Sequence, residues 1–220
     1  AVLFDLDNTL YDVEQYMTGA FADVASYLES EHSLDSEEVY ADLLNLWYAE
    51  TSMYPHLFDD IVKDYDINAD IERIVGIFND HEPEIEPYDA VPELLNTLQE
   101  MGYTLGIITD GTARRQRRKL NALGLRSAFE TVVLTAEVGE AKPSVLPYEE
   151  AARRLNRNPD SCIYIGDNPQ VDFTGAKKVG MGTIRICQGE FSSLSSGPSV
   201  DITVDNICGI YKTICDYPDY

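Results

Sequence analysis

The chain has 220 residues, of which 44% are hydrophobic, enough to bury the core of one large domain or of a domain with an insert. Its 39 acidic residues against 16 basic ones give a formal net charge of −23. Such a charge disfavours binding to nucleic acids or to anionic membrane surfaces. It also repels phosphorylated molecules, so any phosphate site in this chain needs local cations.

The acid excess has two interpretations, a highly soluble surface or adaptation to a salty cytoplasm. The cysteines Cys162, Cys187, Cys208 and Cys215 contain no Cys-x-x-Cys pair, so the sequence indicates neither a zinc site nor a disulfide framework. No signal peptide opens the chain and no apolar run is long enough to cross a membrane, although residues could be missing before Ala1. We therefore expect a cytoplasmic protein.

The first predicted element is an apolar run at residues 1–4, which is typical of a buried strand. It runs directly into Asp5-Leu6-Asp7-Asn8-Thr9. Two carboxylates at the end of a buried strand are costly unless they bind a metal, pair with a cation or take part in chemistry. This stretch is therefore the first candidate for a functional site.

The next segment, residues 12–86, shows apolar residues at helical spacing and no strand pattern. Asp35 and Glu38 are expected to cap one of its helices. The segment is expected to be a small helical domain inserted after the first strand. Residues 1–11 and 87–220 would then form the other domain.

Strands and helices alternate from residue 87 onward, which predicts an α/β fold with a doubly wound, mostly parallel sheet. The expected strands are residues 103–108, 131–135, 162–165, 182–187 and 202–204. The expected helices are residues 92–101, 112–123, 145–155, 169–180 and 206–214.

Polar motifs follow the later strands, as they follow the first. These are Thr109-Asp110-Gly111, Lys142-Pro143, and Gly166-Asp167 with Asp172 five residues later. Ligands bind beyond the carboxyl ends of the strands in an open parallel sheet. We therefore expect these groups to converge with Asp5 and Asp7.

The four motifs, in this order, resemble the signature of the haloacid dehalogenase-like (HAD) hydrolases, and the resemblance covers essentially the whole chain. It is strongest to the phosphatase branch that includes phosphoglycolate phosphatases and nucleotidases. It implies a Rossmann-like core and a helical cap at residues 12–86, which would exclude water and select the substrate. Tyr54 and Phe58, beside Pro55, are expected to contact the leaving group.

The resemblance also implies roles for the acidic residues. Asp5 would be the nucleophile that forms an aspartyl phosphate. Asp7 would be the general acid and base. Asp5, the backbone carbonyl of Asp7 and Asp167 would bind Mg²⁺, and Asp172 would bind or support the metal.

The phosphate group has its own expected partners, which are Thr109, Asp110, Gly111 and Lys142. A carboxylate that attacks a phosphate is repelled by about 4 kcal/mol per unit charge pair at about 4 Å and an effective dielectric near 20. A divalent cation and Lys142 would cancel this repulsion.

We therefore predict a Mg²⁺-dependent phosphatase that hydrolyses small phosphate monoesters through an aspartyl phosphate. The alternatives are a haloacid dehalogenase or a phosphomutase of the same superfamily, or a non-catalytic binding module with this fold. A small phosphate ester is the expected partner, without nucleic acid or membrane, and the oligomeric state is left open. The basic run at residues 114–119 is interpreted as a solvated helix face rather than a nucleic-acid contact.

Overall fold

The computed structural model describes residues 1–216. The chain forms two compact units. The sheet unit contains Ala1–Val13 and Ile85–Tyr220, and the helical unit contains Glu14–Glu84.

The sheet unit is built on a parallel sheet that, within the described residues, has six strands in the order β3-β2-β1-β4-β5-β6. The strands are β1 Val2–Phe4, β2 Leu105–Thr109, β3 Thr131–Leu134, β4 Ile163–Gly166, β5 Gly182–Ile186 and β6 Ile202–Val204. The chain winds outward from β1 through β2 and β3, then returns to the other side of β1 for β4 to β6. The α/β fold with a parallel, doubly wound sheet is confirmed.

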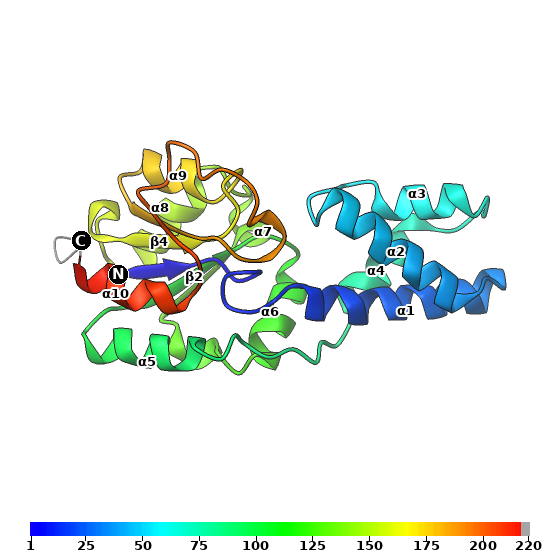
Figure 1. Ribbon diagram of the computed structural model, residues 1–220, viewed down its shortest axis with the longest axis horizontal. Coiled ribbons are helices and arrows are strands. Elements are labelled where there is room, and N and C mark those ends of the chain that lie inside the picture. The colour runs from blue at the N-terminus through cyan, green and yellow to red at the C-terminus, as the bar shows by residue number, and fades with distance from the viewer. Residues whose placement is uncertain (217–220) are drawn as a thin grey trace. The chain divides into compact units, whose positions relative to one another are not determined.

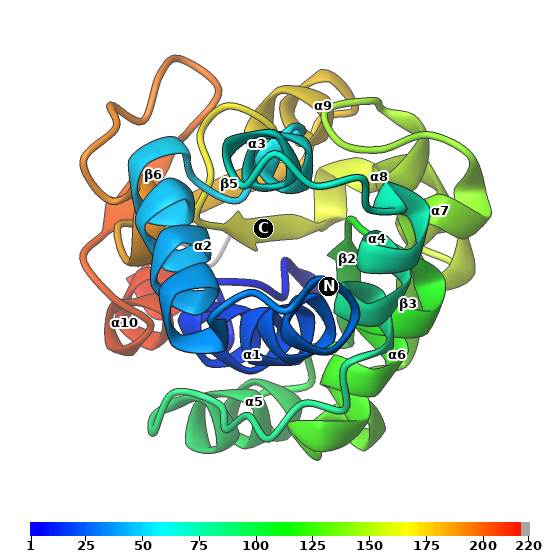
Figure 2. The same cartoon turned by 90° about the vertical axis from the view of Figure 1, so that its right-hand side faces the viewer.

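Helices cover both faces of this sheet. Figures 1 and 2 show α8 and α9 on one face and α5 and α10 on the other. The helices of this unit are α5 Val91–Glu100, α6 Ala113–Ala122, α7 Thr135–Val138, α8 Leu146–Arg154, α9 Phe173–Lys178 and α10 Cys208–Asp216. Short 3₁₀ turns lie at Arg126–Ala128, Pro159–Ser161 and Gly189–Phe191.

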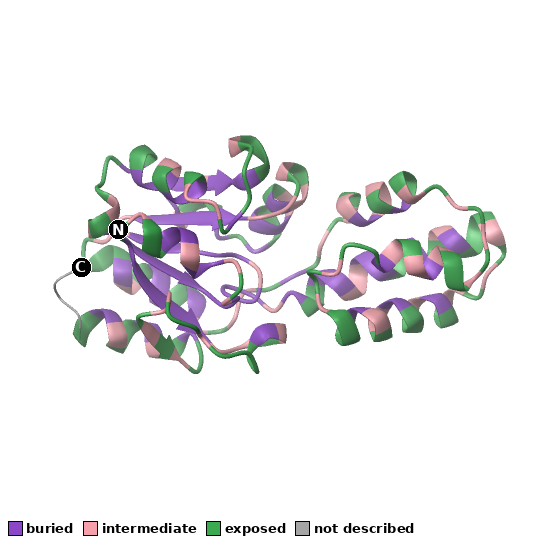
Figure 3. Cartoon of the chain, turned by 90° about the horizontal axis from the view of Figure 1, so that it is seen from above, coloured by how far each residue is buried: buried purple, intermediate pink, exposed green. Residues whose placement is uncertain are grey.

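The core of the sheet unit follows from continuous apolar strands. Every residue of β1, β2, β4 and β5 is buried, as the purple strands in Figure 3 show. Side chains from these strands pack with α8 and α9 in a cluster that includes Leu3, Ile108, Tyr148, Tyr164 and Phe173. Such continuous burial is typical of a parallel sheet that helices cover on both faces, and the polar motifs lie where these buried strands end.

The helical unit consists of α1 Glu14–His32, α2 Ser36–Glu50, α3 Leu57–Asp64 and α4 Ile71–Asp80. Asp35 caps α2 by accepting hydrogen bonds from the backbone N–H groups of Glu37 and Glu38, at 2.9 and 3.1 Å. Its core is aromatic, with ring contacts that join Tyr16, Phe21, Trp47, Phe58 and Phe78. Tyr54 donates a hydrogen bond to Asp60 in the same unit. None of the described helices is long and apolar enough to cross a membrane.

One helix begins later than its sequence pattern suggests. The helix expected from Pro169 begins at Phe173. Residues 167–172 instead form a turn, because the Asp172 carboxylate accepts hydrogen bonds from the backbone N–H groups of Asp167 and Asn168. These bonds compete with helical ones, as Asp side chains often do near helix starts.

Candidate active site

The candidate site lies at the carboxyl ends of β1 and β4, the neighbouring strands between which the winding direction reverses. Ligands in open α/β sheets bind at such a switch point. The register pairs Phe4 with Ile165, so the residues that follow the two strands emerge side by side. The backbone N–H of Asp5 donates to the carbonyl of Ile165 at 2.8 Å, which fixes the start of the first motif.

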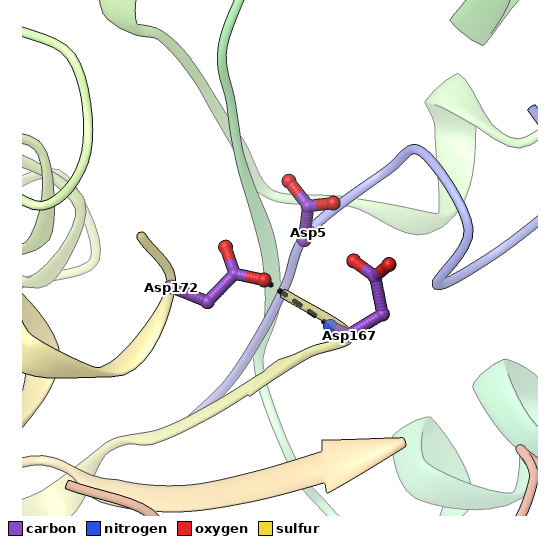
Figure 4. A group of neighbouring side chains, drawn as sticks. All are labelled: Asp5, Asp167 and Asp172. Carbon is purple, nitrogen blue, oxygen red and sulfur yellow. Dashed lines mark hydrogen bonds between the residues drawn. The ribbon is translucent and has the colours of Figure 1, made fainter. Parts of the chain in front are cut away.

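Three buried carboxylates meet at this point. Asp5, Asp167 and Asp172 are 6%, 3% and 1% exposed. Each contributes an oxygen atom that lies within 4.8 Å of the others. Figure 4 shows the three carboxylates grouped together, with Asp5 coming from the end of β1 and Asp167 and Asp172 from the turn after β4. The structure thus brings together three of the predicted metal-binding residues.

The Asp172 side chain is fixed in place by its neighbours. Its Oδ2 accepts the backbone N–H groups of Asp167 at 3.1 Å and Asn168 at 2.9 Å, the first of which is the dashed line in Figure 4. Its Oδ1 accepts the Tyr164 hydroxyl at 3.1 Å. A Cβ at Gly166 would lie 2.5 Å from the Asp172 Oδ2, so this strand end must be glycine for the carboxylate to sit there. Asp172 therefore orders the turn that carries Asp167.

Lys142 supplies the cation for this cluster. Its Nζ lies 2.6 Å from Asp5 Oδ1, 2.7 Å from Asp172 Oδ1 and 3.1 Å from the Tyr164 hydroxyl. The side chain is buried. Burial by itself lowers the pKa of Lys142, but the charges of Asp172 and Asp5 outweigh burial and raise this pKa well above its usual value. Lys142 is therefore a permanent cation in contact with two acids.

One ammonium cannot balance three carboxylates. Burial, and then the neighbouring acids, raise the pKa of Asp5 to about 8 against the opposing effect of Lys142. Burial, Asp172 and Asp5 also raise the pKa of Asp167 well above its usual value. The Asp167 Oδ2 is buried and has no hydrogen-bond partner among the described residues. An all-oxygen donor set with excess negative charge and an unpartnered oxygen fits Mg²⁺, a hard divalent cation.

The second motif lies at the end of β2. Thr109 is 1% exposed, and its hydroxyl accepts a hydrogen bond from Gln116 Nε2 at 2.6 Å. The Asp110 Oδ1 accepts the Thr135 hydroxyl at 2.7 Å and the backbone N–H of Lys142 at 3.2 Å. The Asp110 carboxylate thus braces the loop that presents Lys142. Gly111 has φ +109°, a conformation that side chains with a Cβ rarely adopt.

Asp7 has its own set of donors, separate from the acidic cluster. Its Oδ1 accepts Lys119 Nζ at 2.6 Å and the Tyr11 hydroxyl, and its Oδ2 accepts Gln116 Nε2 at 3.0 Å. Burial favours a higher pKa, but the Lys119 charge and the three hydrogen bonds outweigh it and lower the pKa of Asp7 to about 2. The surroundings of Asp7 therefore favour its ionised form, whereas those of Asp5 favour its protonated form.

Lys119 and Gln116 correct the interpretation of the basic run. We expected residues 114–119 to be a solvated helix face, but Gln116 is fully buried and Lys119 is 2% exposed. The two residues are three positions apart on α6. They share a helix face with the buried Leu120 and with the buried Leu123, which caps the helix. That spacing was a signal that could have identified them, because positions at i, i+3, i+4 and i+7 share one helix face.

The loop after β5 supports the site from the other side. The Arg185 guanidinium, 1% exposed, donates to the carbonyl of Asp167 at 3.1 Å and to two carbonyls of the 189–196 loop. Gln188 Nε2 donates to the carbonyl of Asn8 at 2.9 Å. A Cβ at Gly189 would lie 2.6 Å from the Asn8 Cγ, so the loop backbone must approach the first motif closely. No motif in the sequence predicts these contacts.

The fold and this cluster define a doubly wound α/β protein with an acidic centre at the switch point of its sheet. The family model described as haloacid dehalogenase-like hydrolase matches residues 2–186, so the chain belongs to this family.

Curated relatives and solved structures agree with this assignment. The chain is 34% identical over 212 residues to a glyceraldehyde 3-phosphate phosphatase from Methanopyrus kandleri, covering 92% of this chain and 90% of the relative. It is 29% identical to the pyrophosphatase PpaX of Halalkalibacterium halodurans, covering 83% of this chain and 80% of the relative. A HAD phosphatase from Thermococcus onnurineus has the same fold, with a TM-score of 0.70, 24% identity and 97% coverage of both chains.

These comparisons confirm the family predicted from the sequence. They also support the prediction that the chain is an enzyme, because its relatives are named as phosphatases of this hydrolase family. The role of each site residue is a separate matter, and so is the identity of the metal.

Proposed function

We propose that the protein is a Mg²⁺-dependent phosphatase in which Asp5 attacks the phosphate of a small monoester. The observation that carries this proposal is the convergence of Asp5, Asp167 and Asp172 within 4.8 Å of one another, against Lys142. Buried acids with one shared cation are a poor way to stabilise a protein, but they are what a metal-assisted phosphoryl transfer needs.

The first step transfers the phosphoryl group to the protein. A carboxylate oxygen of Asp5 forms a bond to phosphorus while the bond to the ester oxygen breaks, and Asp7 gives its proton to that oxygen. The negative charge of a bound phosphate disfavours the carboxylate form of Asp7, so substrate binding raises its pKa toward the acid form. Thr109, Lys142 and the backbone N–H groups of residues 110 and 111 would bind the phosphate oxygens.

The second step returns Asp5 to its starting state. The Asp7 carboxylate takes a proton from water while the water oxygen attacks phosphorus. The bond between phosphorus and Asp5 breaks, and inorganic phosphate leaves. Asp7 then carries the proton that the next cycle requires.

The residues that would hold Mg²⁺ are Asp5, Asp167 and the backbone carbonyl of Asp7, with Asp172 as a ligand or as a support for the others. Arg185 would keep Asp167 in position through the Asp167 carbonyl. A bound Mg²⁺ supplies positive charge that offsets repulsion between Asp5 and the phosphate.

We further propose that the helical unit is a cap that selects the substrate. The chain leaves and re-enters the sheet unit through two paired segments, with a bridge between Tyr11 and Pro87 and a 3.0 Å hydrogen bond from Tyr88 N–H to the Leu10 carbonyl. Leu10 and Tyr11 of the first segment follow Asp7 closely in the sequence, and Pro87 and Tyr88 of the second segment pair with them. If the helical unit closes over a bound ligand, a phosphate analogue should protect these linkers from proteolysis. Unchanged cleavage would contradict the role of the helical unit as a cap.

The substrate panel follows from the relatives. Glyceraldehyde 3-phosphate comes first because several relatives are named for it, and pyrophosphate is included because of PpaX. Nucleotide, sugar and organic-acid phosphates complete the panel. Contacts of Tyr54 and Phe58 with the leaving group remain a prediction.

The test is turnover of p-nitrophenyl phosphate and of the panel, with MgCl₂ and then with EDTA. EDTA should abolish turnover, and excess MgCl₂ should restore it. Asp5→Asn should lower kcat by at least about 1,000-fold while the circular dichroism spectrum stays unchanged. The matched control is Asp160→Asn, which changes an exposed acid ahead of β4.

The contrary results are equally definite. The phosphatase proposal would be wrong if a well-folded sample in MgCl₂ hydrolysed neither p-nitrophenyl phosphate nor any member of the panel. Full activity of Asp5→Asn would remove Asp5 as the nucleophile. Release of halide from a 2-haloacid in EDTA would favour the dehalogenase alternative, which needs neither Asp7 nor a metal.

A further inference from the structure

We propose that Lys119 and Gln116, on the inward face of α6, are positioning residues that hold Asp7 where it exchanges a proton with the leaving group and with water. The proposal rests on the proposed function and deepens it. Neither residue belongs to the four motifs that identify the family.

The contacts leave the Asp7 carboxylate little freedom. Lys119 and Tyr11 donate to one oxygen and Gln116 donates to the other, so both oxygens are held. The Asp7 side chain is 28% exposed, whereas the Lys119 side chain is 3% exposed. The acid is therefore partly exposed while its partners hold it from inside the sheet unit, an arrangement suited to a group that must meet a ligand.

The lysine itself is the second argument. An ammonium taken out of water costs several kcal/mol unless it is well paired, and an apolar residue would serve helix packing better. Position 119 lies beside the buried Leu120 and has the Tyr11 ring 5.7 Å from its Nζ. Asp7, which is in contact with the Lys119 ammonium at 2.6 Å, and the charges of Arg115 and Asp5 are among the groups that act on it. A purely structural role does not explain why a cation occupies this position.

Gln116 adds a link between the two parts of the proposed chemistry. Its Nε2 donates to Asp7 Oδ2 at 3.0 Å and to the Thr109 hydroxyl at 2.6 Å. One buried amide thus connects the acid–base group with a proposed phosphate-binding group. A shift of Gln116 would move Asp7 relative to the phosphate, and errors of about 1 Å can cost about 100-fold in rate.

The chemical consequence concerns the ester oxygen. As the bond from phosphorus to this oxygen breaks, the oxygen keeps the electron pair and takes the proton of Asp7, which becomes a carboxylate. The Lys119 ammonium lies where it balances that new negative charge. An alkoxide needs the proton in order to leave, whereas nitrophenolate leaves well without it.

The experiment therefore compares two esters in MgCl₂, glycerol 1-phosphate and p-nitrophenyl phosphate. Lys119→Met should lower kcat for the glycerol ester by about 10- to 100-fold but for the nitrophenyl ester by less than about threefold. Lys119→Arg keeps the cation and should recover part of the loss. Lys177→Met, which removes an exposed lysine from α9, is the matched control and should change neither rate.

A second measurement separates positioning from folding. In an Asp7→Asn background, Lys119→Met should have no further effect on the glycerol ester, because the group it positions is already gone. If Lys119→Met does not fold, Gln116→Met gives the same comparison without removing a charge, and it should show the same preference for the nitrophenyl ester.

Three results would overturn the proposal. One is an equal loss on both esters in a folded Lys119→Met or Gln116→Met variant. Another is an additive effect of Lys119→Met in the Asp7→Asn background. The last is unchanged turnover of the glycerol ester. Each differs from failure of the proposed function, in which the wild-type protein itself hydrolyses neither ester.

Discussion

Replacing Lys142 with methionine should destabilise the protein strongly in the absence of metal. The Lys142 Nζ lies 2.6 Å from Asp5 and 2.7 Å from Asp172, all of them buried. At an effective dielectric of about 20, each contact corresponds to about 6 kcal/mol of gross attraction. Most of that offsets the desolvation of the ammonium. The expected net loss is the cost of leaving buried carboxylates unpaired, about 3–5 kcal/mol.

The loss should depend on pH and on metal. Burial raises the pKa of Asp5 to about 8 even though Lys142 opposes this shift. Removing the Lys142 charge therefore raises the pKa of Asp5 further. Proton uptake by Asp5 then relieves the unpaired charge, and the loss should be smaller at pH 6 than at pH 8. MgCl₂ at 100 times its dissociation constant would restore about 2.7 kcal/mol to a variant that still binds it.

The assay is urea unfolding followed by circular dichroism, in EDTA and in MgCl₂, at both pH values. Lys177→Met is the control, because Lys177 pairs with Asp201 at the surface, with side chains 42% and 28% exposed. An exposed pair contributes at most about 1 kcal/mol. The reasoning is refuted if Lys142→Met loses no more stability than Lys177→Met in EDTA at pH 8.

Two further predictions concern the same cluster. Because folding raises the pKa of Asp5 to about 8, the folded state holds a proton that the unfolded state releases above about pH 4. Without metal, the free energy of unfolding should therefore fall from about pH 4 to pH 8, and MgCl₂ should flatten the curve; a rise measured by urea unfolding would contradict this. Gly166→Ala should cost about 1–3 kcal/mol and weaken Mg²⁺ binding, since its Cβ would lie 2.5 Å from the fixed Asp172 Oδ2. The control Gly76→Ala adds a methyl group on α4 with nothing within 4 Å, so equal losses in calorimetry would refute the steric argument.

The sequence predicted the fold and the acidic cluster for the same physical reason. Apolar runs that end in polar motifs indicate strand ends, and a parallel sheet brings strand ends to one edge. Asp5 and Asp167 were therefore expected at the same edge, and the observed strand order makes β1 and β4 neighbours, which brings the two carboxylates together. Lys142 could be assigned to the same edge from its loop. Its contact with Asp172 as well as Asp5 is a detail that only coordinates supply.

The residues that the sequence did not identify act from the sides of the site. Lys119 lies within a run of mostly basic residues, a composition typical of a solvated surface. It is buried because it lies on the same face of α6 as Gln116 and Leu120. Arg185 lies in the apolar strand β5, and its partners are three backbone carbonyls and the Ser196 hydroxyl, none of which forms a recognisable sequence motif with it. Local patterns report which residue types are present, whereas the direction of a side chain depends on what its helix or strand packs against.

Two acids separated by one residue thus have opposite electrostatic surroundings, which suit the different roles that we propose for them. Asp5 shares Lys142 with Asp172 and has a pKa raised to about 8, while Asp7 is held by Lys119 and has a pKa lowered to about 2. Without a divalent cation, Asp5 is therefore largely protonated near neutral pH and is a poor nucleophile. A cation that took Asp5 and Asp167 as ligands would favour the charged form of Asp5, whereas the Asp7 carboxylate already has its charged form stabilised by Lys119. Metal binding would then act mainly on the protonation state of Asp5, because the Asp7 side chain already pairs with Lys119.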